Sequence, residues 1–129
     1  MERTKRKSEP SIIFCSDFHL REDTPVCWTG DFDEEQWNSV LFINRLQKKY
    51  GCVVIHAGDL FHHWKPSPYL ITRTIKYLPK RFFTIYGQHD LPQHNLDLAI
   101  KSGIATLETA GALTVLSSGC HWGQEPDMG

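Results

Sequence analysis

Short apolar runs alternate along the chain with longer segments in which apolar positions recur every three or four residues. The short runs, rich in β-branched and aromatic residues, are 11–15 (SIIFC), 52–57 (CVVIHA) and 82–86 (FFTIY), with a weaker fourth at 113–116. Runs of this kind predict strands that are covered on both faces of a sheet. Because they alternate with helical segments, we expect an α/β fold: a sheet of mainly parallel strands joined by crossover helices.

The two longest helical segments have recognisable ends. Residues 33–50 begin with acidic side chains, end with two lysines and are followed by Gly51, which suits a left-handed C-cap. Ser67 and Pro68 are an N-cap and a first-turn proline, and the apolar stripe that follows them ends at Pro79. We therefore expect one helix after each of the first two strands.

The length of 129 residues predicts a single domain, and the remaining segments fit into it. A third, shorter helix is predicted at 95–102, stopped by Gly103. Residues 1–10 carry a basic cluster without an apolar stretch, so we predict a mobile tail there and a folded domain over 11–129. No apolar run is long enough to cross a bilayer, which favours a soluble, cytoplasmic protein.

Charge is segregated along the chain although the net charge is only −1. Residues 8–44 sum to −7 and residues 45–81 sum to +7. The basic block is compatible with a surface that binds a polyanion, and equally with solvated helix faces and helix-end charges. The four cysteines form no C-x-x-C pair, which argues against a zinc ribbon or a redox motif.

Side chains that commonly bind metals follow each of the first three predicted strands. They are Asp17 and His19 after the first, Asp59, His62 and His63 after the second, and Gln88, His89 and Asp90 after the third. The carboxyl ends of parallel strands converge on the ligand in open α/β sheets. Gathering several carboxylates and imidazoles there without a cation would be costly. Oxygen and imidazole ligands without thiolates favour Mn²⁺, Fe or Zn²⁺.

These three loops resemble, in the same order, the motifs D-x-H, G-D and G-N-H-[D/E] of the calcineurin-like metallophosphoesterase family. The resemblance covers about residues 11–90. It implies the first half of the family's α/β sandwich and two divalent metal ions, with Mn²⁺ favoured over Fe or Zn²⁺. It also implies that Asp17 and His19 bind the first ion, Asp59 bridges both ions, and Gln88 binds the second.

The resemblance also implies three catalytic roles. His89 would contact the substrate phosphate or protonate the leaving oxygen, and Asp90 would orient His89. The run GDLFHHWKPSP is similar to the DNA-repair exonuclease branch of the family, which implies that His62 lies at the active site. His56, inside a strand, and His94, in a loop, are expected to be structural.

The chain departs from the family pattern in two ways. Gln88 stands where the family has Asn, which implies a loosely bound second metal. The family's later ligands, including a G-H-x-H pair, have no counterpart, so the chain looks like the first half of such an enzyme. We then expect an exposed apolar patch that promotes self-association, with the candidates Leu113, Val115, Leu116 and Trp122.

The sequence therefore favours a metal-dependent phosphoesterase, specifically a phosphodiesterase or exonuclease acting on DNA. The implied reaction is hydrolysis of a phosphoester by water activated by the two cations. Two alternatives stay open at this point. One is a phosphomonoesterase or phosphoprotein phosphatase, and the other is a truncated, non-catalytic remnant that still binds metal or nucleic acid.

Overall fold

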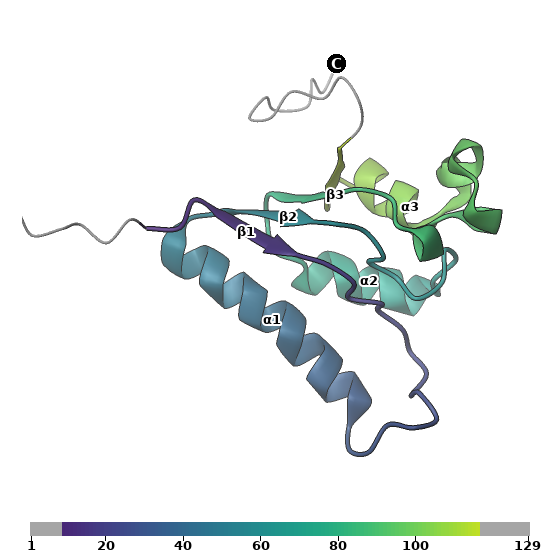
Figure 1. Cartoon of the computed structure of the whole chain (residues 1–129), viewed down its shortest axis with the longest axis horizontal. Helices are drawn as coiled ribbons and strands as arrows, with labels where there is room; N and C mark the ends of the chain where they lie inside the picture. The colour runs from purple at the N-terminus through teal and green to yellow at the C-terminus, as the bar shows by residue number, and fades with distance from the viewer. Residues whose placement is uncertain (1–8, 117–129) are drawn as a thin grey trace, which may run out of the picture.

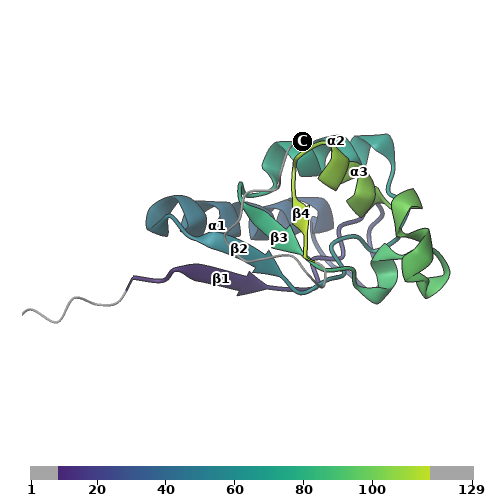
Figure 2. The same cartoon turned by 90° about the horizontal axis from the view of Figure 1, so that it is seen from above.

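A four-stranded parallel sheet forms the centre of the computed structural model, which describes residues 9–116 (Figure 1). The strands are β1 (Ile12–Cys15), β2 (Val53–His56), β3 (Phe82–Thr84) and β4 (Thr114–Val115). They lie side by side in chain order, and each neighbouring pair is parallel (Figure 2). The predicted α/β fold with parallel strands is confirmed. Most of the predicted tail, and Trp122, lie outside the described residues.

Two long helices make the crossovers. Helix α1 (Phe32–Tyr50) begins where the Asp31 side chain accepts a hydrogen bond from the N–H of Glu34, and it ends at Gly51, with φ 64°. Helix α2 (Pro68–Tyr77) begins where the Ser67 side chain accepts a hydrogen bond from the N–H of Leu70. Both N-caps satisfy backbone donors that the first helical turn leaves unpaired. None of the helices in residues 9–116 is long and apolar enough to cross a membrane.

The connection from β3 to β4 differs from the prediction of one helix stopped by Gly103. It contains the 3₁₀ turns η1 (Gln88–Asp90), η2 (Pro92–His94) and η3 (Leu96–Lys101), and then helix α3 (Gly103–Thr109). Gly103 begins a helix because the Ser102 hydroxyl accepts a hydrogen bond from the N–H of Ala105. A Cβ at Gly103 would collide with the Pro66 ring, so glycine here allows α3 to pack closely against the segment before α2.

The core lies between the sheet and the helices. One row of in-register residues, Ile13, Val54 and Phe82, faces it. The helices contribute buried side chains to the same cluster: Trp37, Val40, Leu70, Ile104 and Leu107. Burying a large apolar side chain contributes about 1.5–3 kcal/mol, so this single cluster is the main source of stability.

The opposite sheet face corrects two expectations. The alternate row joins Phe14, Ile55 and Phe83 in register, and Phe14 is 74% exposed, so β1 is not covered on both faces. Leu113, expected in an exposed patch, is only 5% exposed and belongs to the core. Val115 and Leu116 are half-buried, so of the described candidates only Leu113 is clearly wrong, and Phe14 adds an exposed apolar side chain that was not predicted.

Candidate metal centre

The loops after β1 and β2 run side by side at the carboxyl edge of the sheet. The N–H of Asp17 donates to the Gly58 carbonyl over 3.1 Å, and the N–H of His19 donates to the Asp59 carbonyl over 3.0 Å. Asp17, His19 and Asp59 all have left-handed backbone, with φ of 55°, 46° and 56°. Such conformations cost about 1–3 kcal/mol each in a non-glycine residue and cluster at functional sites.

The third loop is joined to the second by the carboxylate of Asp90. This fully buried group accepts hydrogen bonds from the N–H groups of Asp59 (2.8 Å), Phe61 (3.2 Å) and Gly87 (2.8 Å). Burial raises the pKa of Asp90, and these backbone donors oppose that effect. A Cβ at Gly87 would collide with Asp59, so only glycine lets the two loops approach this closely.

Three side chains from the three loops meet at this edge. Ligand atoms of His19, Asp59 and His89 all lie within 4.8 Å of one another. Asp17 joins them, because its Oδ1 is 3.5 Å from Nε2 of His19. The His89 ring lies edge-on to the His19 ring, with centroids 5.0 Å apart. The topology thus brings together carboxylates and imidazoles that lie up to 72 positions apart in the printed sequence.

The surroundings of Asp59 favour the negatively charged form of its carboxylate. Burial raises its pKa, but this effect is outweighed by the hydrogen bond that it accepts from the N–H of His89 over 2.8 Å and by the His89 ring. Nδ1 of that ring is 3.4 Å from Oδ1 of Asp59. The pKa of Asp59 is therefore below its ordinary value, and its charged form is available to a cation.

The residues at this edge fit a divalent cation. Nδ1 of His19 is buried and has no hydrogen-bond partner within residues 9–116. An unpaired buried ring nitrogen is costly unless something binds it. Imidazole nitrogens together with carboxylate oxygens are ligands for Mn²⁺, Fe and Zn²⁺.

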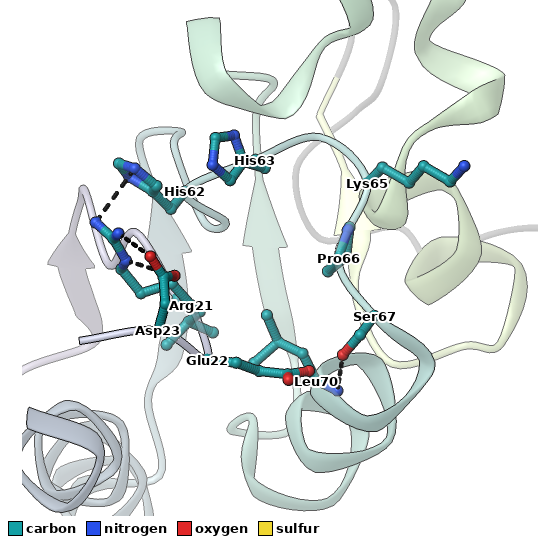
Figure 3. A pocket seen from close by; sticks show the side chains of 10 residues that line it. Arg21, Glu22, Asp23, His62, His63, Lys65, Pro66, Ser67 and Leu70 are labelled. Atoms are coloured by element: carbon teal, nitrogen blue, oxygen red, sulfur yellow. Dashed lines mark hydrogen bonds and ion pairs between the residues drawn. The ribbon is translucent and has the colours of Figure 1, made fainter. Parts of the chain in front are cut away.

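A cleft of about 130 Å³ adjoins the centre and includes His62 (Figure 3). Arg21 donates from Nη1 to Nε2 of His62 over 3.2 Å, and Asp23 holds the rest of the guanidinium by accepting from its Nε and Nη2. Because a guanidinium only donates, Nε2 of His62 accepts, and the proton of the neutral ring is on Nδ1. Burial, and then the nearby charge of Arg21, lower the pKa of His62.

The remaining predicted residues have distinct places. Gln88 is exposed at the start of η1, next to His89. Its backbone carbonyl accepts a hydrogen bond from the His94 ring. His56 is fully buried, and its Nδ1 accepts from the N–H of Gly58. The carboxylate nearest the His89 ring is that of Asp59, whereas Asp90 binds backbone. The individual ligand and catalytic assignments stay predictions.

Arg21 and Asp23 were not identified from the sequence. Their signal was an Arg-x-Asp one residue beyond the D-x-H motif, but charged loop residues are usually solvated, and the partner of Arg21 is 41 positions away. Only the folded arrangement of the two loops shows that Arg21 acts on His62.

Comparison with known protein families identifies one that covers this stretch of the chain. The model of the calcineurin-like phosphoesterase family matches residues 10–120, a stretch that contains β1 and all three loops of the centre. No curated protein matched the chain.

Proposed function

The chain belongs to the calcineurin-like phosphoesterase family, and from this premise we propose that it is a metal-dependent phosphodiesterase that acts on DNA. The observation that carries the proposal is the convergence of His19, Asp59 and His89 at the carboxyl edge of the sheet, where their ligand atoms lie within 4.8 Å. Ligands at this edge are the rule in open α/β sheets.

Four residues are proposed to hold two divalent cations: Asp17, His19, Asp59 and Gln88. Such a pair of ions lowers the pKa of water and neutralises charge on the phosphate. Asp59 suits the bridging position because it is the central carboxylate, between the loops that carry His19 and His89. Asp17 is more open to solvent, with 61% of its side chain exposed, and lies where a substrate can approach.

His89 and His62 are proposed to contact the phosphate. The His89 side chain is 43% exposed, and its Nδ1 faces Asp59, which leaves Nε2 to bind a phosphate oxygen or to protonate the leaving oxygen. The His62 ring lies parallel to the His89 ring, with centroids 5.8 Å apart. With its Nε2 occupied by Arg21, neutral His62 donates from Nδ1 and does not accept a proton there.

Asp90 is proposed as a positioning residue. Its carboxylate lies among the backbone N–H groups of the loops after β2 and β3 and does not touch the open centre. By holding Gly87 and Asp59 together, it sets the distance between the His89 ring and the Asp59 carboxylate.

The preference for DNA rests on the resemblance of residues 58–68 to nucleases. Lys65 and Arg21 line the cleft beside His62, but Glu22 and Asp23 line it as well and Asp23 pairs with Arg21, so the cleft has no net positive charge. Other members of the basic block are elsewhere, because Lys48 and Lys49 occupy the last turn of α1 and Arg73 pairs with Asp33. The charges at the cleft therefore do not favour DNA over another phosphodiester.

The proposal is tested by hydrolysis assays with Mn²⁺ on bis(p-nitrophenyl) phosphate, p-nitrophenyl phosphate and linear DNA. We expect the diester and DNA to be cleaved, and chelation by EDTA to abolish cleavage. Asp59→Asn should lower kcat/KM by about a hundred-fold or more, since losing even a residue that only orients a ligand costs about 10–100-fold.

Asp97→Asn is the matched control, because Asp97 is exposed in η3 and outside the centre. Its activity should equal that of the wild type. Cleavage of the monoester alone would identify a phosphomonoesterase. Mn²⁺ binding without hydrolysis of any of the three substrates would identify a metal-binding protein without this activity.

A further inference from the structure

A groove of about 420 Å³ begins at Asp17 and runs between the loop after β1 and the first half of α1. Its walls include the aromatic side chains Phe18, Trp28 and Phe32. Because Asp17 belongs both to this groove and to the metal centre, a molecule whose phosphate lies at the centre can extend directly into the groove.

The aromatic wall is held in place by the helix. Trp28 packs edge-to-face on Phe32, the first residue of α1, with ring centroids 5.2 Å apart and an interplanar angle of 77°. Gln36 fixes the start of the loop, because its side chain bonds both the N–H and the carbonyl of Arg21 over 2.9 Å. Trp28 nevertheless stays 42% exposed. A supported aromatic ring with an accessible surface is a stacking platform.

Size and charge identify the kind of occupant. The groove falls within the range of about 300–1,000 Å³ typical of small-molecule sites, whereas the cleft beside His62 is smaller, at about 130 Å³. The lining contributed by the described residues includes the carboxylates of Asp17 and Glu35 and no lysine or arginine, so a second phosphate would be repelled. A neutral planar ring with N–H donors avoids that repulsion and can donate to Glu35 or to Ser39.

We propose that this groove binds the nucleobase attached to the phosphate at the metal centre, stacked on Trp28. The inference rests on the proposed function, because it places that phosphate beside Asp17. It goes further because it predicts that the protein recognises unstacked bases. A nucleotide at a strand end or in a single strand fits the groove, and a paired base does not.

The test compares a ligand that has a base with one that lacks it. Isothermal titration calorimetry with Mn²⁺ present measures the affinity for thymidine 5′-monophosphate and for 2-deoxyribose 5-phosphate. Base stacking predicts that the wild type binds the nucleotide about 5- to 150-fold more tightly. Trp28→Ala should remove this difference, and Trp28→Phe should keep most of it.

Trp64→Phe is the matched control, because Trp64 lies outside the groove, between β2 and α2. It should discriminate between the two ligands as the wild type does. The circular dichroism spectrum and melting temperature of each variant confirm folding, and the conservative Trp28→Phe change keeps the test decisive if Trp28→Ala fails to fold.

Equal affinity of the wild type for the two ligands would overturn the inference, as would discrimination that survives Trp28→Ala. If bis(p-nitrophenyl) phosphate is still hydrolysed in either case, the proposed function stands and only the base site fails. If neither phosphate ligand binds and no diester is hydrolysed, both proposals fail together.

Discussion

Left-handed backbone at Asp17, His19 and Asp59 shows, at the scale of the single residue, how this chain stores strain at its centre. Each of these residues follows a strand, and hydrogen bonds between the two loops hold the conformations in place. Strain of about 1–3 kcal/mol per residue persists only where surrounding contacts over-determine it. A bound cation would add to those contacts, so metal binding should also stabilise the fold.

The first prediction at the residue scale concerns the length of the side chain at position 88. If the Gln88 amide oxygen is a metal ligand, Gln88→Asn shortens it to the amide that the family has at this position, and the affinity for Mn²⁺ should stay equal or rise up to about ten-fold. Isothermal titration calorimetry measures this affinity. Gln93→Asn, an exposed position in η2, should leave it unchanged. A large loss for Gln88→Asn alone would show that the longer side chain matches its backbone position.

His56 makes stability depend on pH. Burial lowers the pKa of His56 to about 4, so the folded state binds fewer protons than the unfolded state between about pH 4 and 6.5. The free energy of unfolding should therefore rise with pH across this window and fall on acidification, by up to about 3 kcal/mol. Urea unfolding at pH 5 and pH 7.5 measures the difference.

His56→Gln should be less sensitive to pH than the wild type in that window, whereas His94→Gln, at an exposed position in η2, should match the wild type. An unchanged pH dependence in His56→Gln would mean that other groups cause it.

At the scale of the element, the turn from β3 into η1 decides whether the loops can meet. Gly87 has φ −86°, a value that any residue adopts, so its glycine is not needed for backbone conformation. It is needed for space, because a Cβ there would collide with the backbone N and the carboxylate of Asp59. The packing of two loops therefore constrains this position.

Gly87→Ala should push the β3 turn away from Asp59. We expect destabilisation of about 1–3 kcal/mol, as for other overpacked sites, together with at least ten-fold weaker Mn²⁺ binding. Gly51→Ala provides the contrast, since Gly51 has φ 64° and open space around it. Gly51→Ala should lower the free energy of unfolding by about 1 kcal/mol through backbone strain and leave the affinity for Mn²⁺ unchanged. Equal metal affinities in the two variants would contradict this account of Gly87.

At the scale of the whole molecule, helices pack on one face of the sheet, and Phe14 stands out from the other. Ile55 and Phe83 lie in register beside it, and Ile85, 42% exposed, follows β3. A contiguous apolar surface of this kind marks an interaction site or an aggregation hazard.

Phe14→Ser should therefore reduce both self-association and binding of a hydrophobic dye. Sedimentation velocity and dye fluorescence measure the two effects. Val26→Ser is the matched control, because Val26 is fully exposed but sits in a loop away from the sheet. A wild-type protein that stays monomeric and does not bind dye would refute the prediction.

The sequence by itself determined the order of strands and helices and the positions of the chemistry along them. Apolar runs of strand length and helical periodicity are local patterns, as are the caps at Ser67 and Gly51, whereas the N-cap at Asp31 came from the structure. The local patterns predicted the parallel sheet and placed Asp17, His19 and Asp59 at strand ends. Parallel strands put all their carboxyl ends on one edge, so the approximate location of the centre followed without tertiary information.

Tertiary structure alone decided which groups touch. That Asp90 binds the backbone of two loops, that Arg21 reaches His62, and that Gly103 packs against Pro66 all depend on how separate segments pack. The exposure of Phe14 has the same origin, because an apolar strand pattern is identical whether one face of the sheet is covered or both. Local patterns encode the conformation of a segment, whereas contacts between distant residues form only when the core brings those segments together.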